Sequence, residues 1–249
     1  MTKTPYYSIL LAVLLLACSS RLLAATDSDA LSAQASNLKV IELYTSQGCS
    51  SCPPADKFLS ELALSSSTIT LACHVTYWDY LGWKDSFSNP FCDKRQYTYK
   101  RYLNTFSSYT PQMVINGRYE GVGSQRLKIK SLLGDAEKDD ALLPISIDTT
   151  ETKLLIDISA LDNKRTMELY VLGVGESSVV DIKKGENHNR TIEYHNPVIY
   201  SRLISMDTDT KNRLVEDVSD AAGIAHWVVL AQDIRTGGIM AAGKMYPKG

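Results

Sequence analysis

Short apolar runs and helically spaced apolar stripes follow one another regularly along the first half of the chain. Residues 38–44 and 68–77 are brief β-rich runs, which are typical of buried strands. Three stripes have the spacing of an amphipathic helix: Ala55, Phe58, Leu59 and Leu62; Tyr99, Tyr102, Leu103 and Phe106; and Ile129, Leu132, Leu133 and Ala136. Asn116-Gly117 stands between two further β-prone runs and predicts a hairpin, because both turn positions need a positive φ. The order β-α-β-α-β-β-α predicts an α/β domain over residues 38–140, with helices covering a mixed sheet.

The second half of the chain has a different pattern, with few helical periods and many short β-prone runs. These runs are Ile145–Thr149, Leu154–Ile158, Met167–Val174, Ile192–Ile204 and His226–Ile234. Short strands at close intervals are typical of an antiparallel sheet folded on itself, so we expect an antiparallel β-sandwich domain over residues 144–247. The charged residues 137–140, followed by Pro144, mark the boundary between the two domains.

The first 25 residues have the features of an export signal. Residues 9–17 are an apolar run that is too short to span a bilayer, which needs about 20 apolar residues, but has the length of a signal-peptide core. Two processing routes stay open. Residues 15–18 resemble a bacterial lipobox, in which Cys18 would be lipidated, and the other route is cleavage after Ala24 or Ala25. We therefore expect an exported protein, either periplasmic or lipid-anchored in the bacterial cell envelope.

Composition narrows the classes of function. The 249 residues carry a net charge of −2 and no basic block, so an electrostatic case for nucleic-acid binding is missing. A hydrophobic fraction of 44% is ordinary for a globular protein, and we expect membrane contact only through the signal peptide or a lipid anchor. Residues 26–37 are small and polar and predict a tether. Setting Cys18 aside leaves four cysteines, an even number that suits an oxidising compartment.

Cys49 and Cys52 form a C-x-x-C motif between a predicted strand and a predicted helix. Unpaired N–H groups and the helix dipole at a helix start favour a thiolate, which is the nucleophilic form of cysteine. We expect Gly48 to leave the Cys49 sulfur accessible and Cys52 to reach it, which permits thiol–disulfide exchange. Two alternatives stay open: an inert disulfide, or half of a metal site completed by Cys73, His74 and Cys92. Glu42, in the preceding strand, is either a buried proton acceptor for Cys52 or an exposed edge residue.

Several unusual strings of residues extend this motif. They are ELYTSQGCSSCPPAD (residues 42–56), HVTYWDYLGWKD (residues 74–85), YTPQ (residues 109–112), NGR (residues 116–118), GEN (residues 185–187) and HN (residues 195–196). Together they resemble the exported thioredoxin-like family catalogued as domain of unknown function 1223, across nearly the whole chain after the signal. Arg95-Gln96 fits a pair usual in that family, whereas Cys73 and Cys92 look like additions to it.

The resemblance implies a thioredoxin-like fold for the first domain and a location in the cell envelope. In such folds a cis proline precedes the third strand and faces the cysteine pair, and Thr110-Pro111 occupies that place. We expect Thr110 and Pro111 to orient a partner peptide as an added strand, with Trp78 and Trp83 shaping the cleft beside Cys49. Ordinary loop packing is the alternative for the two tryptophans.

Cys73 and Cys92 are the remaining thiols of the expected exported chain. They either pair in a structural disulfide, or leave Cys73 in the core and Cys92 at the surface.

The function that these observations favour is thiol–disulfide exchange on envelope proteins that carry thiols or disulfides. Cys49 would attack, Cys52 would resolve the mixed disulfide, and neither an organic cofactor nor a metal is required. One rival is a non-catalytic binding or scaffolding module. The other is a copper- or zinc-handling envelope protein that uses the same thiols with His74.

Overall fold

The computed structural model describes residues 38–161, 166–206 and 210–247, which belong to one compact unit. The first half contains β1 (Lys39–Thr45), α3 (Pro53–Leu62), β2 (Thr68–His74), the 3-10 helix η1 (Asp79–Leu81), α4 (Pro90–Tyr102), β3 (Gln112–Ile115), β4 (Tyr119–Val122) and α5 (Arg126–Ala136). The second half contains β5 (Leu143–Pro144), β6 (Ser146–Thr149), β7 (Lys153–Asp157), β8 (Met167–Gly175), β9 (Ser178–Ile182), β10 (Arg190–Tyr194), β11 (Val198–Ser205), β12 (Arg213–Asp217), β13 (Ile224–Asp233) and β14 (Ile239–Met245).

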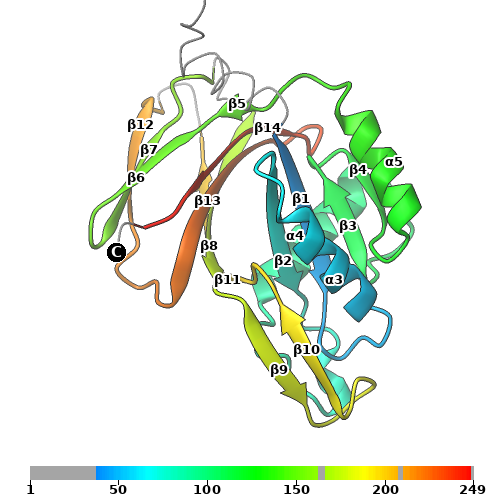
Figure 1. The fold of residues 1–249 in the computed structure, drawn as a ribbon. Coiled ribbons are helices and arrows are strands. Elements are labelled where there is room, and N and C mark those ends of the chain that lie inside the picture. The colour runs from blue at the N-terminus through cyan, green and yellow to red at the C-terminus, as the bar shows by residue number, and fades with distance from the viewer. Residues whose placement is uncertain (1–37, 162–165, 207–209, 248–249) are drawn as a thin grey trace, which may run out of the picture. The chain divides into compact units, whose positions relative to one another are not determined.

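The first half is a four-stranded mixed sheet with helices on both faces, as the sequence pattern predicts (Figure 1). The strand order is β2-β1-β3-β4, in which β1 and β2 are parallel and the other pairs antiparallel. Side chains alternate between the two faces along a strand. Ile41 and Leu43 pack against α3 and α5, whereas Tyr44 packs against α4. The α/β class of this half is confirmed.

The predicted hairpin turn is correct, but the predicted end of the second helix is wrong. Asn116 and Gly117 both have positive φ and join β3 to β4, which confirms the hairpin. The predicted apolar stripe continued to Phe106, but α4 ends at Tyr102 and the Phe106 side chain is fully exposed. Asn104, with a φ of 50°, turns the chain away from the helix before Phe106.

The second half is a largely antiparallel β region of several sheets. A five-stranded sheet, β11-β8-β13-β14-β5, packs through one apolar cluster against a three-stranded sheet, β12-β7-β6. The run Ile192–Ile204, predicted as one strand, is divided into β10 and β11. Asn196 has a φ of 53° there and Pro197 has no N–H to donate, so the strand cannot continue through these residues.

Strands β9 and β10 form a separate two-stranded hairpin that reaches the first half (Figure 1). The chain just after β10 pairs with the edge strand β2, because the Ala72 N–H donates to the Asn196 carbonyl. The hairpin also contacts α3. It therefore lies beside the residues that follow β1 and β2.

The two halves share an apolar core. Val40, Ile69 and Leu71 of the first sheet lie in one buried cluster with Leu172 and Val228 of the five-stranded sheet. This contact uses the α4 face of the first sheet, whereas the opposite face packs against α3 and α5. Among the described residues, no helix has both the length and the apolar character needed to cross a membrane.

Candidate functional site

Cys49 and Cys52 lie in the loop between β1 and α3, at the carboxyl end of two parallel strands. They are joined in a disulfide whose Cα atoms are 5.4 Å apart. Cys52 is the N-cap residue of α3 and has helical dihedral angles, while Pro53 and Pro54 occupy the first turn, where their missing N–H groups cost no hydrogen bond. The predicted position of the cysteine pair, between a strand and a helix, is confirmed. Cys49 itself lies in the turn that precedes the helix.

The expectation that the Cys49 sulfur is accessible is wrong. Cys49 is 1% exposed and Cys52 is 0% exposed, although Ser50 and Ser51 between them are exposed. Gly48 does not open the site, because the Trp78 side chain packs against it, 3.3 Å from where a Cβ would stand. On the side of the second half, the β9–β10 hairpin holds the same loop through hydrogen bonds.

Two residues at the tip of the hairpin bind the backbone of the cysteine loop. The buried Asn187 amide donates to the carbonyls of Gln47, at 2.9 Å, and Cys49, at 2.8 Å. Glu186 accepts a hydrogen bond from the Ser50 N–H at 3.0 Å, and hydrogen bonds from Ser50 lower the pKa of the Glu186 carboxyl. Both lie in the GEN string, which was the only signal that could have identified them.

The structure brings the predicted partner-binding residues to this site. The Thr110–Pro111 peptide bond is cis and immediately precedes β3. Because Tyr44 pairs with Gln112, Pro111 lies beside the end of β1, from which the cysteine loop departs. Trp78, which packs on Gly48, donates from Nε1 to the Thr110 hydroxyl at 2.8 Å.

Trp83 contacts the cysteine loop through Gln47. Its Nε1 donates to the Gln47 Oε1 at 2.9 Å, and its Cβ lies 3.5 Å from where a Cβ on Gly185 of the hairpin would stand. Both tryptophans are therefore partly buried packing residues around the loop, which leaves their role toward a partner a prediction.

Beneath the cysteine loop, on the α3 face of the sheet, lies a group of buried polar side chains. We call it the acid–imidazole cluster, and it consists of Thr45, Asp56, His74, Asp85 and Tyr194. His74 Nδ1 is 2.7 Å from Asp85 Oδ2, and the His74 and Tyr194 rings are 5.2 Å apart. Of these residues, only His74 was expected from the sequence to take part in a site, as a metal ligand.

Several atoms of the acid–imidazole cluster have no hydrogen-bond partner among the described residues. They are Thr45 Oγ1, both carboxylate oxygens of Asp56, His74 Nε2 and the Tyr194 hydroxyl. Buried polar atoms are normally paired, since an unpaired one costs about 1–3 kcal/mol. Such a concentration next to a cysteine pair is unusual for a purely structural region.

Burial and charge shift the pKa values within this cluster. Burial raises the pKa of Asp56 to about 7, although the neighbouring charge of His74 and the Thr45 hydroxyl oppose the rise. Burial alone would lower the pKa of His74, but the charge and hydrogen bond of Asp85, with the charge of Asp56, raise it. Burial would raise the pKa of Asp85, yet His74 and the N–H groups of Gln47 and Phe87 lower it. His74 and Asp85 therefore form a buried ion pair beside Asp56.

Glu42 has neither of the two roles considered for it. It is 1% exposed and points to the α4 face, opposite the acid–imidazole cluster. There it makes a bidentate ion pair with Arg95 and accepts a hydrogen bond from the Tyr99 hydroxyl at 2.5 Å. It is therefore not the proton acceptor for Cys52.

Cys73 and Cys92 lie on the same opposite face, where they join β2 to α4. They form a disulfide with Cα atoms 5.3 Å apart, and both are buried. The thiols of Cys73 and Cys92, which could have completed a metal site with His74, are therefore oxidised. His74 itself is paired with Asp85. Within the described ranges, no three His, Cys, Asp or Glu side chains are grouped as metal ligands. Cys18 and the export signal lie outside the described residues.

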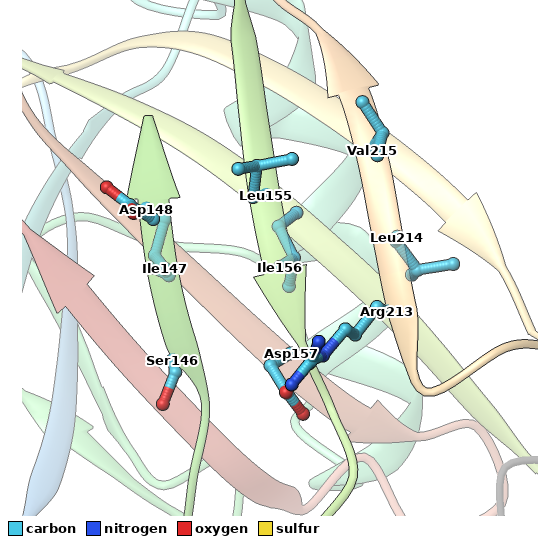
Figure 2. Close-up of a pocket in the computed structure, with 9 residues that line it drawn as sticks. All are labelled: Ser146, Ile147, Asp148, Leu155, Ile156, Asp157, Arg213, Leu214 and Val215. Carbon is cyan, nitrogen blue, oxygen red and sulfur yellow. The ribbon is translucent and has the colours of Figure 1, made fainter. Parts of the chain in front are cut away.

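A pocket on the three-stranded sheet is lined by residues of β6, β7 and β12 (Figure 2). Its floor includes Leu155 and Val215, which are partly exposed, and an ion pair between Asp157 and Arg213 at 3.1 Å. A second hollow lies between α3 and β10, next to Pro53 and Arg190. This hollow adjoins the cysteine loop, because Pro53 directly follows Cys52.

Comparison with known proteins places the chain in a family. It is similar to the crystal structure of protein AGR_C_4864 from Agrobacterium tumefaciens, with 28% identity, a TM-score of 0.70, and coverage of 84% of this chain and 94% of that one. HBP35 of Porphyromonas gingivalis is similar in fold at 12% identity, with a TM-score of 0.55 and coverage of 85% and 75%. No sequence among the curated proteins matches significantly. The model of the family described as protein of unknown function (DUF1223) matches residues 40–232, and the chain therefore belongs to that family.

Proposed function

We propose that this protein carries out thiol–disulfide exchange on protein substrates through Cys49 and Cys52. The observation that carries the proposal is the position of the pair. It follows a central parallel strand, caps a helix, and lies beside a cis-proline loop at the same edge of the sheet. This arrangement supports a thioredoxin-like interpretation of the first half. The five-stranded and three-stranded sheets, which pack through one apolar cluster, support a β-sandwich interpretation of the second half.

The exchange would start from the disulfide that the structure contains. A thiolate of a partner protein attacks the Cys49 sulfur, the Cys49–Cys52 bond breaks, and Cys52 departs as a thiolate that takes up a proton. A second partner thiolate then releases Cys49, so that the partner gains a disulfide and this protein becomes a dithiol. Run in reverse, the dithiol reduces a partner disulfide. Thr110 and Pro111 would hold the partner's backbone next to the cysteine loop.

The buried state of Cys49 adds a condition to the proposal. Attack on the Cys49 sulfur requires the loop to leave its contacts with Trp78 and Asn187, at least transiently. We therefore include opening of the β9–β10 hairpin as a step before exchange.

Export and the identity of the partners belong to the same proposal. The signal-like residues 1–25 and a C-x-x-C disulfide suit an envelope protein that acts on thiols or disulfides of other envelope proteins.

Reduction of insulin by dithiothreitol, followed as turbidity, tests the proposal. The wild-type protein should accelerate the reaction, and Cys49→Ala should abolish the acceleration. A Cys73→Ala/Cys92→Ala double variant is the control, because it removes the second disulfide and leaves the first. A Cys52→Ala variant should also accumulate a mixed disulfide through Cys49. Equal rates for wild type and Cys49→Ala would contradict the proposal.

One observation favours a second function, a non-catalytic binding or scaffolding module. The disulfide is buried and its loop is held by side chains from the other half of the chain, as a structural disulfide would be. In that case Cys49→Ala would lower stability without changing any exchange rate.

A further inference from the structure

The acid–imidazole cluster contains a carboxylate for which the fold offers no structural use. Asp56 is 5% exposed and neither oxygen makes a hydrogen bond of good geometry to a described residue, so only the Thr45 hydroxyl and the charge of His74 favour its ionised form. A buried carboxylate without a partner destabilises a fold, and such groups concentrate at functional sites. The question is which reacting group Asp56 serves.

The helix geometry places Asp56 next to Cys52. Cys52 has helical dihedral angles, and the Asp56 N–H donates to the Cys52 carbonyl at 3.1 Å, so the two residues are one helical turn apart. Side chains four residues apart lie on one face of a helix, with about 5–6 Å between their Cβ atoms. Cys52 is fully buried, so a proton that leaves its thiol needs an acceptor inside the protein.

We propose that Asp56 takes the proton of the Cys52 thiol when Cys52 attacks a mixed disulfide on Cys49, and returns it when Cys52 is released. The charge of His74, which is paired with Asp85, favours the carboxylate form of Asp56. This inference rests on the proposed exchange function and assigns its proton acceptor.

The step balances in atoms and charge. The Asp56 carboxylate becomes a carboxylic acid as the Cys52 thiol loses its proton, the new bond forms between the Cys52 and Cys49 sulfurs, and the partner leaves as a thiolate. The partner is reduced and the cysteine pair is oxidised.

The neighbours of Asp56 suit this role. Thr45 and His74, at the ends of the paired strands β1 and β2, face it from the sheet, and Tyr194 faces it from β10. The charge of Asp85 raises the pKa of Asp56 further, Asp79 acts on His74, and Arg190 acts on Tyr194. Burial raises the pKa of Asp56 to about 7, which is the range in which a carboxyl both accepts and returns a proton at neutral pH.

A single-turnover reaction with dithiobis(nitrobenzoate) separates the two cysteines. The reduced protein releases one nitrothiolate when Cys49 attacks the reagent and a second when Cys52 closes the disulfide, and both are followed by absorbance. In Asp56→Asn we expect the second phase to slow at least tenfold at pH 7 and its rise with pH to move to higher pH. The first phase should stay within about twofold of wild type. Glu61→Gln, an exposed carboxylate on the same helix, is the matched control and should change neither phase.

The outcomes distinguish this inference from the exchange function. If the wild-type protein shows no first phase in the absence of denaturant, the exchange function fails. If both phases occur and Asp56→Asn leaves the rate and pH profile of the second unchanged, the exchange function stands and the role of Asp56 is wrong. A ¹³C NMR titration of Asp56 in the wild-type protein needs no variant. A carboxyl that titrates near pH 4 would also overturn the inference.

Discussion

At the scale of the residue, the two faces of the first sheet bury charged side chains in opposite ways. On the α4 face, Glu42 and Arg95 satisfy each other, and Tyr99 and Gln232 complete the set. On the α3 face, Asp56 has no hydrogen-bond partner among the described residues. A fully paired buried charge is typical of a structural role, whereas a buried carboxylate without a hydrogen bond of good geometry is a candidate for a functional one.

The Glu42–Arg95 ion pair on the α4 face should contribute to stability. Arg95→Ala leaves the Glu42 carboxylate buried without its partner, so the free energy of unfolding should fall by about 3–5 kcal/mol. Urea denaturation of the oxidised protein measures it. Arg126→Ala is the control, because Arg126 pairs with Glu61 at the surface and its loss should matter far less. Equal effects of the two substitutions would contradict the account of the Glu42 network.

On the α3 face the expected effect is opposite: removing the charge of Asp56 should stabilise the protein, by an amount that depends on pH. The pKa of Asp56 rises from 3.8 to about 7 on folding, so the native state binds its proton more tightly and loses stability as the pH rises through that window. Asp56→Asn removes this loss. The variant should therefore match wild type near pH 4 and exceed it at pH 8, by at most about 4 kcal/mol for the three pH units between the two values. Thermal unfolding across pH measures the difference. A variant that is less stable than wild type at pH 8 would show that the carboxylate is paired after all.

The conformation and burial of a single residue were predictable from the sequence only where they do not depend on residues far away in the chain. The Asn116-Gly117 turn follows from neighbouring residues and was expected correctly, whereas the cis bond before Pro111 was expected correctly from the resemblance to thioredoxin-like folds. The burial of Cys49 was not, because it depends on Asn187, which is 138 residues away in the chain. Asp56 was visible in the sequence only as the last residue of the cysteine string. Nothing in helical spacing alone indicates that it has no partner.

At the scale of the element, the β9–β10 hairpin links the second half to the cysteine loop. Its tip supplies two donors from Asn187 and one acceptor from Glu186 to backbone groups of residues 47–50. The sequence pattern did not predict β5, β9, β12 or β14. β14 is rich in Ala and Gly, which have low β propensity, and β12 carries charged residues at three of its five positions. The pairing of β9 with β10 was therefore not predicted from the sequence.

The hairpin contact makes a kinetic prediction. Asn187→Ala removes both hydrogen bonds to the loop, so reduction of the Cys49–Cys52 disulfide by dithiothreitol should accelerate about tenfold, as a loss of roughly 1.4 kcal/mol would produce. Quenched alkylation and mass spectrometry give the rate. His188→Ala, an exposed neighbour on the same tip, should behave as wild type. An unchanged rate in Asn187→Ala would show that the hairpin does not control access to the disulfide.

At the scale of the whole described chain, the two halves are joined by a common apolar cluster. Val40, Ile69 and Leu71 would be exposed to water if the second half were absent, and Arg95 would lose Gln232 and Tyr170. The boundary near residues 140–144 follows from a change in sequence pattern. The shared core was not predictable, because a buried strand looks alike whichever element covers it.

The shared core predicts cooperative unfolding. Calorimetry of the oxidised protein should show one transition that includes both halves, with equal calorimetric and van't Hoff enthalpies. The double substitution Leu172→Ala/Val228→Ala, in the five-stranded sheet, should lower the midpoint reported by the first half as well. Two separate transitions, of which only one responds, would show that the halves unfold as independent domains.

The central claim is that one of the two disulfides is made to open and the other is not. Equilibration of the folded protein with glutathione buffers, followed by differential alkylation and mass spectrometry, compares them in the same molecule. We expect the Cys49–Cys52 disulfide to open reversibly as the buffer becomes more reducing, while Cys73–Cys92 stays closed. If both disulfides stay closed until denaturant is added, the cysteine pair is structural and the exchange function is contradicted.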